Sequence, residues 1–177
     1  MNYAQWKYNK RDEYYTPPIL VEPILKYAIG KIWCPFDTED SEFVIQLKEN
    51  GNEVVHSHLW EGKDFFTYEP DSYDMIISNP PFTLKLQVLK RLYELNKPFA
   101  LILGLPILNY QVVGEFFLDK QLQLLIMDKK VSYDGNTSSF NSSYFCKDML
   151  PTDIIFHHLP HNNTKVNFIG SKMKKKI

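Results

Sequence analysis

The sequence has little cysteine and no long apolar run. Its two cysteines, Cys34 and Cys146, lie one in each half of the chain and show no CxxC spacing. This excludes a disulfide framework and a zinc knuckle. No apolar run approaches the roughly 18 residues that a membrane-spanning helix needs, and the first residues do not resemble a signal segment. These absences predict a protein of a reducing, cytoplasmic compartment that makes no contact with a membrane.

Charge of one sign is also scarce. The chain carries 20 Lys and Arg against 21 Asp and Glu, a formal net charge of −1. No strong overall field therefore attracts the protein to nucleic acid or to an anionic membrane. The one concentrated basic run is "SKMKKKI" at 171–177, which is typical of a solubilising chain end. His56 and His58 have no carboxylate or cysteine at ligand spacing, so no metal site is predicted.

The 177 residues, 44% of them hydrophobic, suit one globular domain and are too few for two comfortable ones. We expect an N-terminal arm over residues 1–15, a single domain over 16–160 and a Lys-rich tail over 161–177. The arm and the tail lack the clean hydrophobic period of the residues between them.

Short apolar runs alternate with amphipathic segments along the domain. Strands are predicted at 31–36, 53–59, 72–78, 98–107 and 122–128. Helices are predicted at 16–30 (regular from about Leu20), 37–51, 84–96 and 110–120. In the second helix, Asp37, Glu39 and Asp40 would complement the helix dipole at its first turn.

This alternation predicts an α/β fold, with an open, mostly parallel sheet and helices on both faces. After residue 128 the pattern changes to short β runs between turn residues, which indicates a final antiparallel hairpin or edge. Ligands of such sheets bind beyond the carboxyl ends of the strands. The segments that follow the strands, at 34–37, 56–64 and 79–82, are therefore the candidate site.

The most informative of these segments is the corner in "DMIISNPPF" (74–82). Pro80 and Pro81 have fixed φ angles and force an extended exit from the strand. The side-chain oxygen of Asn79 and a neighbouring carbonyl would then form two acceptors that hold both hydrogens of an –NH2 group. Phe82 offers a flat face for the ring that carries this amine. A Pro-Pro turn that merely ends a strand, with Phe82 in the core, is the competing interpretation.

With these residues the sequence resembles a known family, the S-adenosylmethionine-dependent amino-methyltransferases that act on adenine. "NPPF" after "YDMIIS" is similar to their catalytic motif, and "DEYYTPP" (12–18) is similar to their segment over the methionine part of the cofactor. Residues 32–66, which end in "GKDFF", follow the order of their cofactor half. These motifs most resemble those of the EcoRI-type adenine-specific DNA methyltransferases, often found on phages. The matches span residues 12–110, with a weaker similarity at 142–156.

The resemblance implies a Rossmann-like methyltransferase fold, S-adenosylmethionine as cofactor and DNA as partner, in a bacterial or phage-infected cell. It implies that the catalytic corner, which orients the amine and stacks on a flipped base, consists of Asn79, Pro80, Pro81 and Phe82. It implies that the cofactor is bound by Tyr15, Thr16, Pro17, Cys34, Pro35, Phe36, Asp37, His58, Asp64 and Phe65. In this set the first three contact the methionine part, 34–37 form the loop beside the cofactor, and the last two lie at its adenine ring.

The sequence departs from the family in three features. The loop at 34–40 has no glycine, and His58 stands where an acid usually holds the ribose hydroxyls, with Glu61 close enough to substitute. The chain also leaves little for target recognition beyond the arm, the polar loop at 133–143 and the tail, so a homodimer or a separate target-recognition partner is expected.

Three interpretations of the function follow from these features. The first is methyl transfer to adenine in DNA. The second keeps the chemistry but moves it to RNA adenine or to a protein glutamine, because an amide –NH2 meets the same two acceptors. The third is a methyltransferase-like binding or decoy protein without catalysis, as a loop without glycine would allow.

Overall fold

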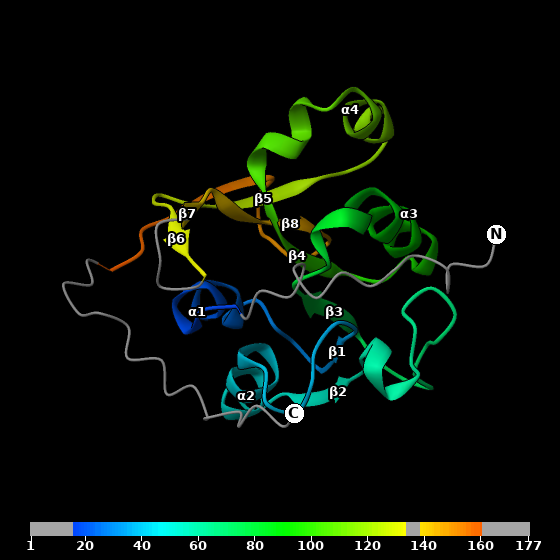
Figure 1. The fold of residues 1–177 in the computed structure, drawn as a ribbon. Helices are drawn as coiled ribbons and strands as arrows, with labels where there is room; N and C mark the ends of the chain where they lie inside the picture. The colour runs from blue at the N-terminus through cyan, green and yellow to red at the C-terminus, as the bar shows by residue number, and fades with distance from the viewer. Residues whose placement is uncertain (1–15, 134–138, 161–177) are drawn as a thin grey trace, which may run out of the picture.

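The computed structural model describes residues 16–133 and 139–160. Their main element is a seven-stranded sheet in the order β2-β1-β3-β4-β8-β5-β9 (Figure 1). Its strands are β1 (Lys31–Cys34), β2 (Glu53–His56), β3 (Met75–Ser78), β4 (Phe99–Gly104), β5 (Gln123–Met127), β8 (Ser142–Lys147) and β9 (Ile154–His157). A separate antiparallel pair consists of β6 (Val131–Ser132) and β7 (Ser139–Phe140).

The sheet is mostly parallel, as the sequence predicted. Strands β2, β1, β3 and β4 pair in parallel, and so do β5 and β9. Strand β8 is antiparallel to both of its neighbours, with Ala100 opposite Cys146 on one side and Leu125 opposite Tyr144 on the other. The antiparallel strands expected near the C-terminus are therefore present, but β8 lies inside the sheet rather than in a hairpin with β9.

Helices cover both faces of this sheet. On one face α1 (Pro18–Leu25) and α2 (Glu42–Glu49) cover one hydrophobic cluster, the α1–α2 core. On the other face α3 (Lys85–Leu95) and α4 (Gln111–Phe117) cover a second cluster, the α3–α4 core (Figure 1). Alternate strand residues point to opposite faces: Ile32 and Cys34 join the α1–α2 core, and Trp33 joins the α3–α4 core. None of the helices in the described ranges is long and apolar enough to cross a membrane.

Two helices begin at other residues than expected. Helix α1 begins at Pro18 rather than near Leu20, because proline fits the first turn of a helix, and its N-cap is Pro17. Helix α2 begins at Glu42, where the Ser41 side chain caps it by accepting a hydrogen bond from Val44 N at 3.4 Å. The prediction that Asp37, Glu39 and Asp40 lie in the first turn of this helix was therefore wrong.

All five predicted strands are shorter in the structure, and three of them end two or more residues early. Strand β1 ends at Cys34, before Pro35, and β2 ends at His56. Strand β4 ends at Gly104, where Pro106 opens a short 3-10 helix, η5 (Leu105–Asn109). Two further 3-10 turns, η3 (Leu59–Glu61) and η4 (Phe82–Leu84), follow β2 and β3. Each shortened strand end lengthens the loop at the carboxyl edge of the sheet.

Candidate active site

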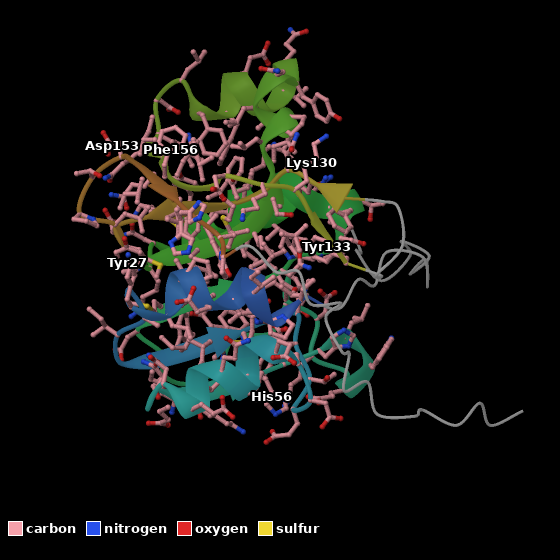
Figure 2. The ribbon with its side chains drawn as sticks, turned by 90° about the vertical axis from the view of Figure 1, so that its left-hand side faces the viewer. Tyr27, His56, Lys130, Tyr133, Asp153 and Phe156 are labelled. Atoms are coloured by element: carbon pink, nitrogen blue, oxygen red, sulfur yellow. The ribbon has the colours of Figure 1, made fainter. Side chains whose placement is uncertain are left out.

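The carboxyl ends of β1 and β3 form the centre of the candidate site. From β1 the chain proceeds to β2 on one side, whereas β3 lies on the other side of β1. This reversal of strand order is where open α/β sheets form a ligand crevice. Tyr133 and Lys130 lie at one edge of the molecule and Tyr27, beyond the end of α1, lies at the opposite edge (Figure 2).

Asp37 bridges this reversal point. Its Oδ2 accepts a hydrogen bond from the Ser78 hydroxyl at 2.5 Å, and both side chains are buried. Ser78 is the last residue of β3 and directly precedes Asn79. The loop after β1 is thus tied to the corner after β3 by a carboxylate, which explains how a loop without glycine is held in place.

Burial raises the pKa of Asp37 to about 6, although the hydroxyls of Ser78 and Ser41 and the nearby His56 act in the opposite direction. No lysine or arginine in the described part of the chain forms an ion pair with this carboxylate. A buried carboxylate without a basic partner is costly in the ionised form. Asp37 is therefore a group that a bound cation would stabilise.

Replacement of Asp37 by Asn is expected to stabilise the protein above pH 6. The folded state keeps the Asp37 proton up to about pH 6, whereas the unfolded state releases it near pH 4. The contribution of Asp37 to the free energy of unfolding is therefore largest below about pH 4, where the group is protonated in both states. This contribution falls by at most about 3 kcal/mol as the pH rises through 6. Asn stays neutral and still accepts from Ser78. Urea unfolding at pH 4 and pH 8 measures this, and an equal effect at both values would contradict it.

The corner residue Asn79 is oriented by a second long-range contact. Its Nδ2 donates to the Thr16 hydroxyl at 3.1 Å, across 63 residues of sequence. This bond assigns the nitrogen to the Thr16 side, so the acceptor Oδ1 lies on the other branch of the amide. Pro80 is buried, and Pro81, with φ −59° and ψ 134°, leads in extended form into η4. The hydrogen bond to Thr16 and the two prolines thus make the corner rigid.

A cavity of about 290 Å³ lies beside this corner. Such a volume is close to the lower end of ordinary ligand pockets, about 300 Å³. Three aromatic side chains line it, from η4, from the start of α4 and from the residues after β6: Phe82, Tyr110 and Tyr133. Lys85 also lines the cavity, and its Nζ lies 4.9 Å from the centre of the Phe82 ring. The cavity therefore combines flat apolar faces with one cation.

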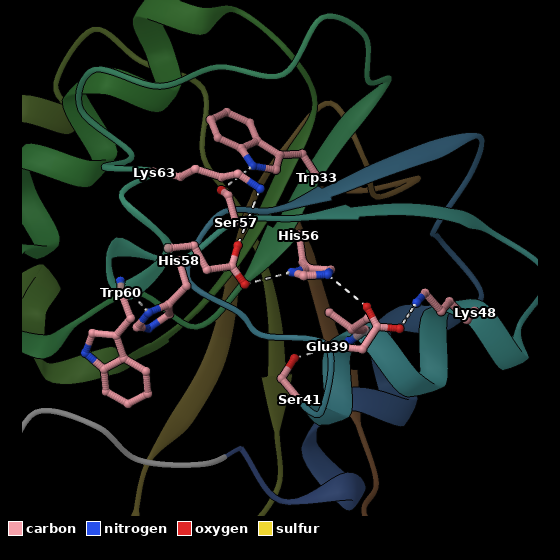
Figure 3. A network of polar contacts seen from close by, with 11 residues as sticks. Trp33, Glu39, Ser41, Lys48, His56, Ser57, His58, Trp60 and Lys63 are labelled. Carbon is pink, nitrogen blue, oxygen red and sulfur yellow. Dashed lines mark hydrogen bonds and ion pairs between the residues drawn. The ribbon is translucent and has the colours of Figure 1, made fainter.

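A polar network lies at the end of β2 (Figure 3). His56 Nε2 is 2.9 Å from Glu39 Oε2, and its Nδ1 is 3.8 Å from Glu61 Oε1. His58 lies beyond the strand and caps η3, because its Nδ1 accepts from Trp60 N at 3.2 Å. The strand predicted over 53–59 therefore ends before His58. Since His58 Nδ1 already accepts this hydrogen bond, Glu61 is the better candidate to accept hydrogen bonds from the ribose hydroxyls.

An aromatic cluster supports the loop after β1. The ring centre of Phe36 lies 4.9 Å from that of Phe65, which in turn lies 5.5 Å from that of Trp33. Trp33 Nε1 donates to the buried Ser57 hydroxyl at 2.9 Å. The Phe36 ring thus packs against the Phe65 ring in a tilted arrangement. Asp64, before this ring, accepts from Phe66 N at 3.0 Å and forms a turn.

The remaining candidates from the sequence are placed as follows. Thr16 and Pro17 lie buried beside Asn79 and at the start of α1. Cys34 and Pro35 are also buried, and the Cys34 carbonyl accepts from Ser57 N at 3.1 Å, so these two residues shape the loop through their packing and backbone. Tyr15 lies outside the described residues.

Sequence reasoning missed several residues of this edge. Ser78 was detectable, because it directly precedes Asn79. Lys85 and Tyr110 had no such signal, because only the fold places them beside the cavity. Trp60 and Tyr133 lie in the segments 56–64 and 133–143 that the sequence indicated, but nothing in the sequence distinguished them within those segments. Within residues 16–133 and 139–160, no group of three or more His, Cys, Asp or Glu side chains is arranged to hold a metal ion.

No model of a known protein family and no curated protein matches this sequence. Among solved structures, the chain is similar to the methyltransferase subunit of a type I restriction-modification system from Streptococcus thermophilus. The TM-score is 0.50 at 12% identity, over 82% of this chain and 47% of that one, so this chain spans about half the neighbour's length. It is also similar to a release-factor-specific protein-(glutamine-N5) methyltransferase from Alicyclobacillus acidocaldarius, with a TM-score of 0.40 at 13% identity, over 75% and 93% of the two chains. The fold is the Rossmann-like methyltransferase fold, as the sequence predicted.

Proposed function

We propose that this chain transfers a methyl group from S-adenosylmethionine to the exocyclic amine of adenine in DNA. The observation that carries the proposal is the corner after β3. There Asn79 is oriented by Thr16, and Phe82, three residues later, lines a cavity. The fold supports the proposal because its reversal of strand order lies at this same corner.

The corner suits a planar nitrogen nucleophile. The side-chain oxygen of Asn79 and the Pro80 carbonyl would accept the two amine hydrogens, which draws the nitrogen lone pair out of conjugation with the ring. Phe82 and Tyr110 would hold the ring between flat faces, and the cavity would keep water from the reacting atoms. In a duplex the base must first leave the stack.

Residues of the loops after β1 and β2 suit the cofactor. Asp37 would bind its α-ammonium group, because the hydrogen-bond donors to this buried carboxylate within the described residues are the hydroxyls of Ser78 and Ser41. Glu61 would accept from the ribose hydroxyls, and Trp60 would lie against the adenine ring. When bound, the cofactor supplies a methyl group on a sulfonium, whose departure leaves a neutral thioether. The chain then has only to align and desolvate the two reactants.

The cavity favours a nucleobase over a protein glutamine. A glutamine amide has no ring to place between aromatic side chains, whereas the cavity has three such rings and the Lys85 ammonium. We propose that target choice depends on a separate target-recognition partner or a second copy of the chain. The arm at 1–15 and the tail at 161–177 remain candidates for contact with the nucleic acid.

Two measurements test the proposal. Calorimetric titration with S-adenosylmethionine should give a saturable heat, and its absence would favour a non-catalytic binding protein. Tritiated S-adenosylmethionine should then label unmethylated DNA at N6 of adenine. Label in RNA or in protein glutamine, with none in DNA, would move the same chemistry to the second interpretation.

Asp37→Asn supplies a further test. Its affinity for S-adenosylmethionine should fall about tenfold or more at pH 8, because a buried carboxylate–ammonium contact exceeds a neutral one by well over 1 kcal/mol. The wild-type affinity should weaken as the pH falls through 6, since Asp37 then takes up a proton, and the variant should not show this change. A variant that is more stable yet binds as well as wild type would contradict the assignment.

Trp60→Ala is expected to weaken cofactor affinity without loss of stability. Trp60 is 55% exposed, so its truncation costs little packing, whereas the loss of a base–aromatic stack costs about 1–3 kcal/mol. Fluorescence or calorimetric titration measures the change. Leu59→Ala is the matched control, because Leu59 is the adjacent exposed apolar residue of η3. An equal loss in both variants would assign the effect to the turn and not to the ring.

A further inference from the structure

Strand β9 forms one edge of the sheet and has no second neighbour among the described strands. Its side chains alternate: Ile155 packs on the α1–α2 core, whereas Ile154 and Phe156 face outward and are 56% and 76% exposed. Figure 2 shows Asp153 and Phe156 on this peripheral strand, far from His56 on β2. An apolar edge strand of this kind is a template for pairing with another strand.

The backbone of β9 also points to pairing. The carbonyls of Asp153 and His157 accept from Leu124 N at 2.7 Å and Asp128 N at 3.1 Å on the inner side. Because the hydrogen-bonding groups of a strand alternate in direction, those of Ile154 and Phe156 point outward. One of these four groups, the Ile154 carbonyl, accepts from the Thr152 hydroxyl at 3.3 Å. The two most exposed side chains of β9 thus belong to the residues whose backbone faces outward.

We propose that β9 pairs antiparallel with β9 of a second copy, about a two-fold axis at Ile155. In this register Ile154 lies opposite Phe156 of the other copy, and the four outward backbone groups of each strand bond across the axis. An aromatic side chain opposite a β-branched one is a favourable cross-strand pair. The two sheets then join into one continuous sheet.

A second copy is the occupant that this strand fits best, because the strand is complementary to itself. The same register places Asp153 opposite His157 of the other copy, on the α1 face. His157 already has an acid nearby, since its Nε2 is 3.7 Å from Glu22 Oε2. The pairing thus brings carboxylate to imidazole twice, once on each side of the axis. It needs no change at the candidate active site, which β4, β8 and β5 separate from β9.

Sedimentation equilibrium of the full chain tests the pairing. We expect twice the 20.9 kDa mass of one chain for the wild type, and a dissociation constant at least about 30-fold higher for Phe156→Glu, as for a central interface residue. Leu118→Glu is the control, because Leu118 is even more exposed, at 85%, but lies at the end of α4. Circular dichroism checks that both variants fold. A monomeric wild type, or a dimer that survives Phe156→Glu, would overturn the proposal.

Cysteine pairing tests the register. Asp153 and His157 of the other copy form a non-hydrogen-bonded pair, whose Cα atoms lie about 4.5 Å apart, within disulfide range. Asp153→Cys and His157→Cys should therefore form a disulfide dimer only when mixed and oxidised. Cys34 and Cys146 are buried and do not compete. A disulfide in either variant alone, or none in the mixture, would exclude this register.

Amide exchange distinguishes the other occupants. In the dimer, the amides of Ile154 and Phe156 should exchange more slowly in the wild type than in Phe156→Glu at equal concentration. Slow exchange in a monomer would show that another part of the same chain covers β9. Fast exchange in a monomer that becomes slow only with a different protein would identify a foreign strand instead, and either result would overturn the dimer.

Discussion

Asn79→Ala is expected to lower methyl transfer by about 10²–10³-fold, the usual loss when one orienting group is removed from a site. Ala removes the acceptor that holds the amine and the donor that bonds to Thr16 at 3.1 Å. The affinity for S-adenosylmethionine should stay within a few fold, because the candidate cofactor residues belong mainly to the loops after β1 and β2. Single-turnover transfer of tritiated methyl groups, together with calorimetric binding, separates the two effects.

The control for this variant is Asn50→Ala. Asn50 is an exposed amide at the C-terminal end of α2, whereas the loop that contains Asp37 precedes the N-terminal end of this helix. Its loss should therefore leave transfer unchanged. Asn79→Ala should also cost only about 1 kcal/mol of stability, the net value of one hydrogen bond. Undiminished transfer by a folded Asn79→Ala protein would refute the role of the corner and not merely its magnitude.

Trp33→Ala is expected to cost about 3–5 kcal/mol of stability, as large aromatic truncations in protein cores do. Trp33 is fully buried, packs against Phe65 and Tyr73 with ring centres 5.5 and 5.1 Å away, and donates to Ser57. Its loss would leave a cavity and would remove the hydrogen-bond donor from a buried hydroxyl. Denaturant unfolding followed by circular dichroism measures this change.

Trp60→Ala serves as the matched control for stability, because the same side chain is mostly exposed there and its loss should change stability by about 0.5 kcal/mol or less. The two tryptophans thus separate packing from binding. Trp33→Ala should destabilise the fold, whereas Trp60→Ala should weaken the cofactor complex. A Trp33→Ala protein that unfolds like wild type would mean that the aromatic cluster does not support the loop after β1.

The corner at Asn79 was largely predictable. The run before it is apolar and short, and two prolines follow, so a strand over 72–78 was expected; β3 begins later, at Met75, but does end at Ser78. The prediction succeeded because strand length, proline geometry and turn chemistry depend on residues that are adjacent in sequence. The contact between Asn79 and Thr16 was not predictable, because it joins segments far apart in the chain.

Asp37 shows the opposite case. From the sequence it was expected to lie at the start of a helix, where an acid is common. In the structure it is buried and bonded to Ser78, and burial raises its pKa to about 6. Local sequence could not indicate this, because burial depends on which strands lie on either side. The helix instead begins after Ser41, whose side chain is the better cap.

The sequence by itself determined the α/β alternation, the mostly parallel sheet and the position of the Asn-Pro-Pro-Phe corner at a strand end. These features depend on hydrophobic period and turn residues, which act over a few neighbouring positions. Only the tertiary structure decided that β8 lies between β4 and β5, that Asp37 reaches Ser78, and that Tyr110, Tyr133 and Lys85 share a cavity with Phe82. Such contacts result from the packing of segments distant in sequence, whose pairing is chosen by the burial of the whole core and not by any local pattern.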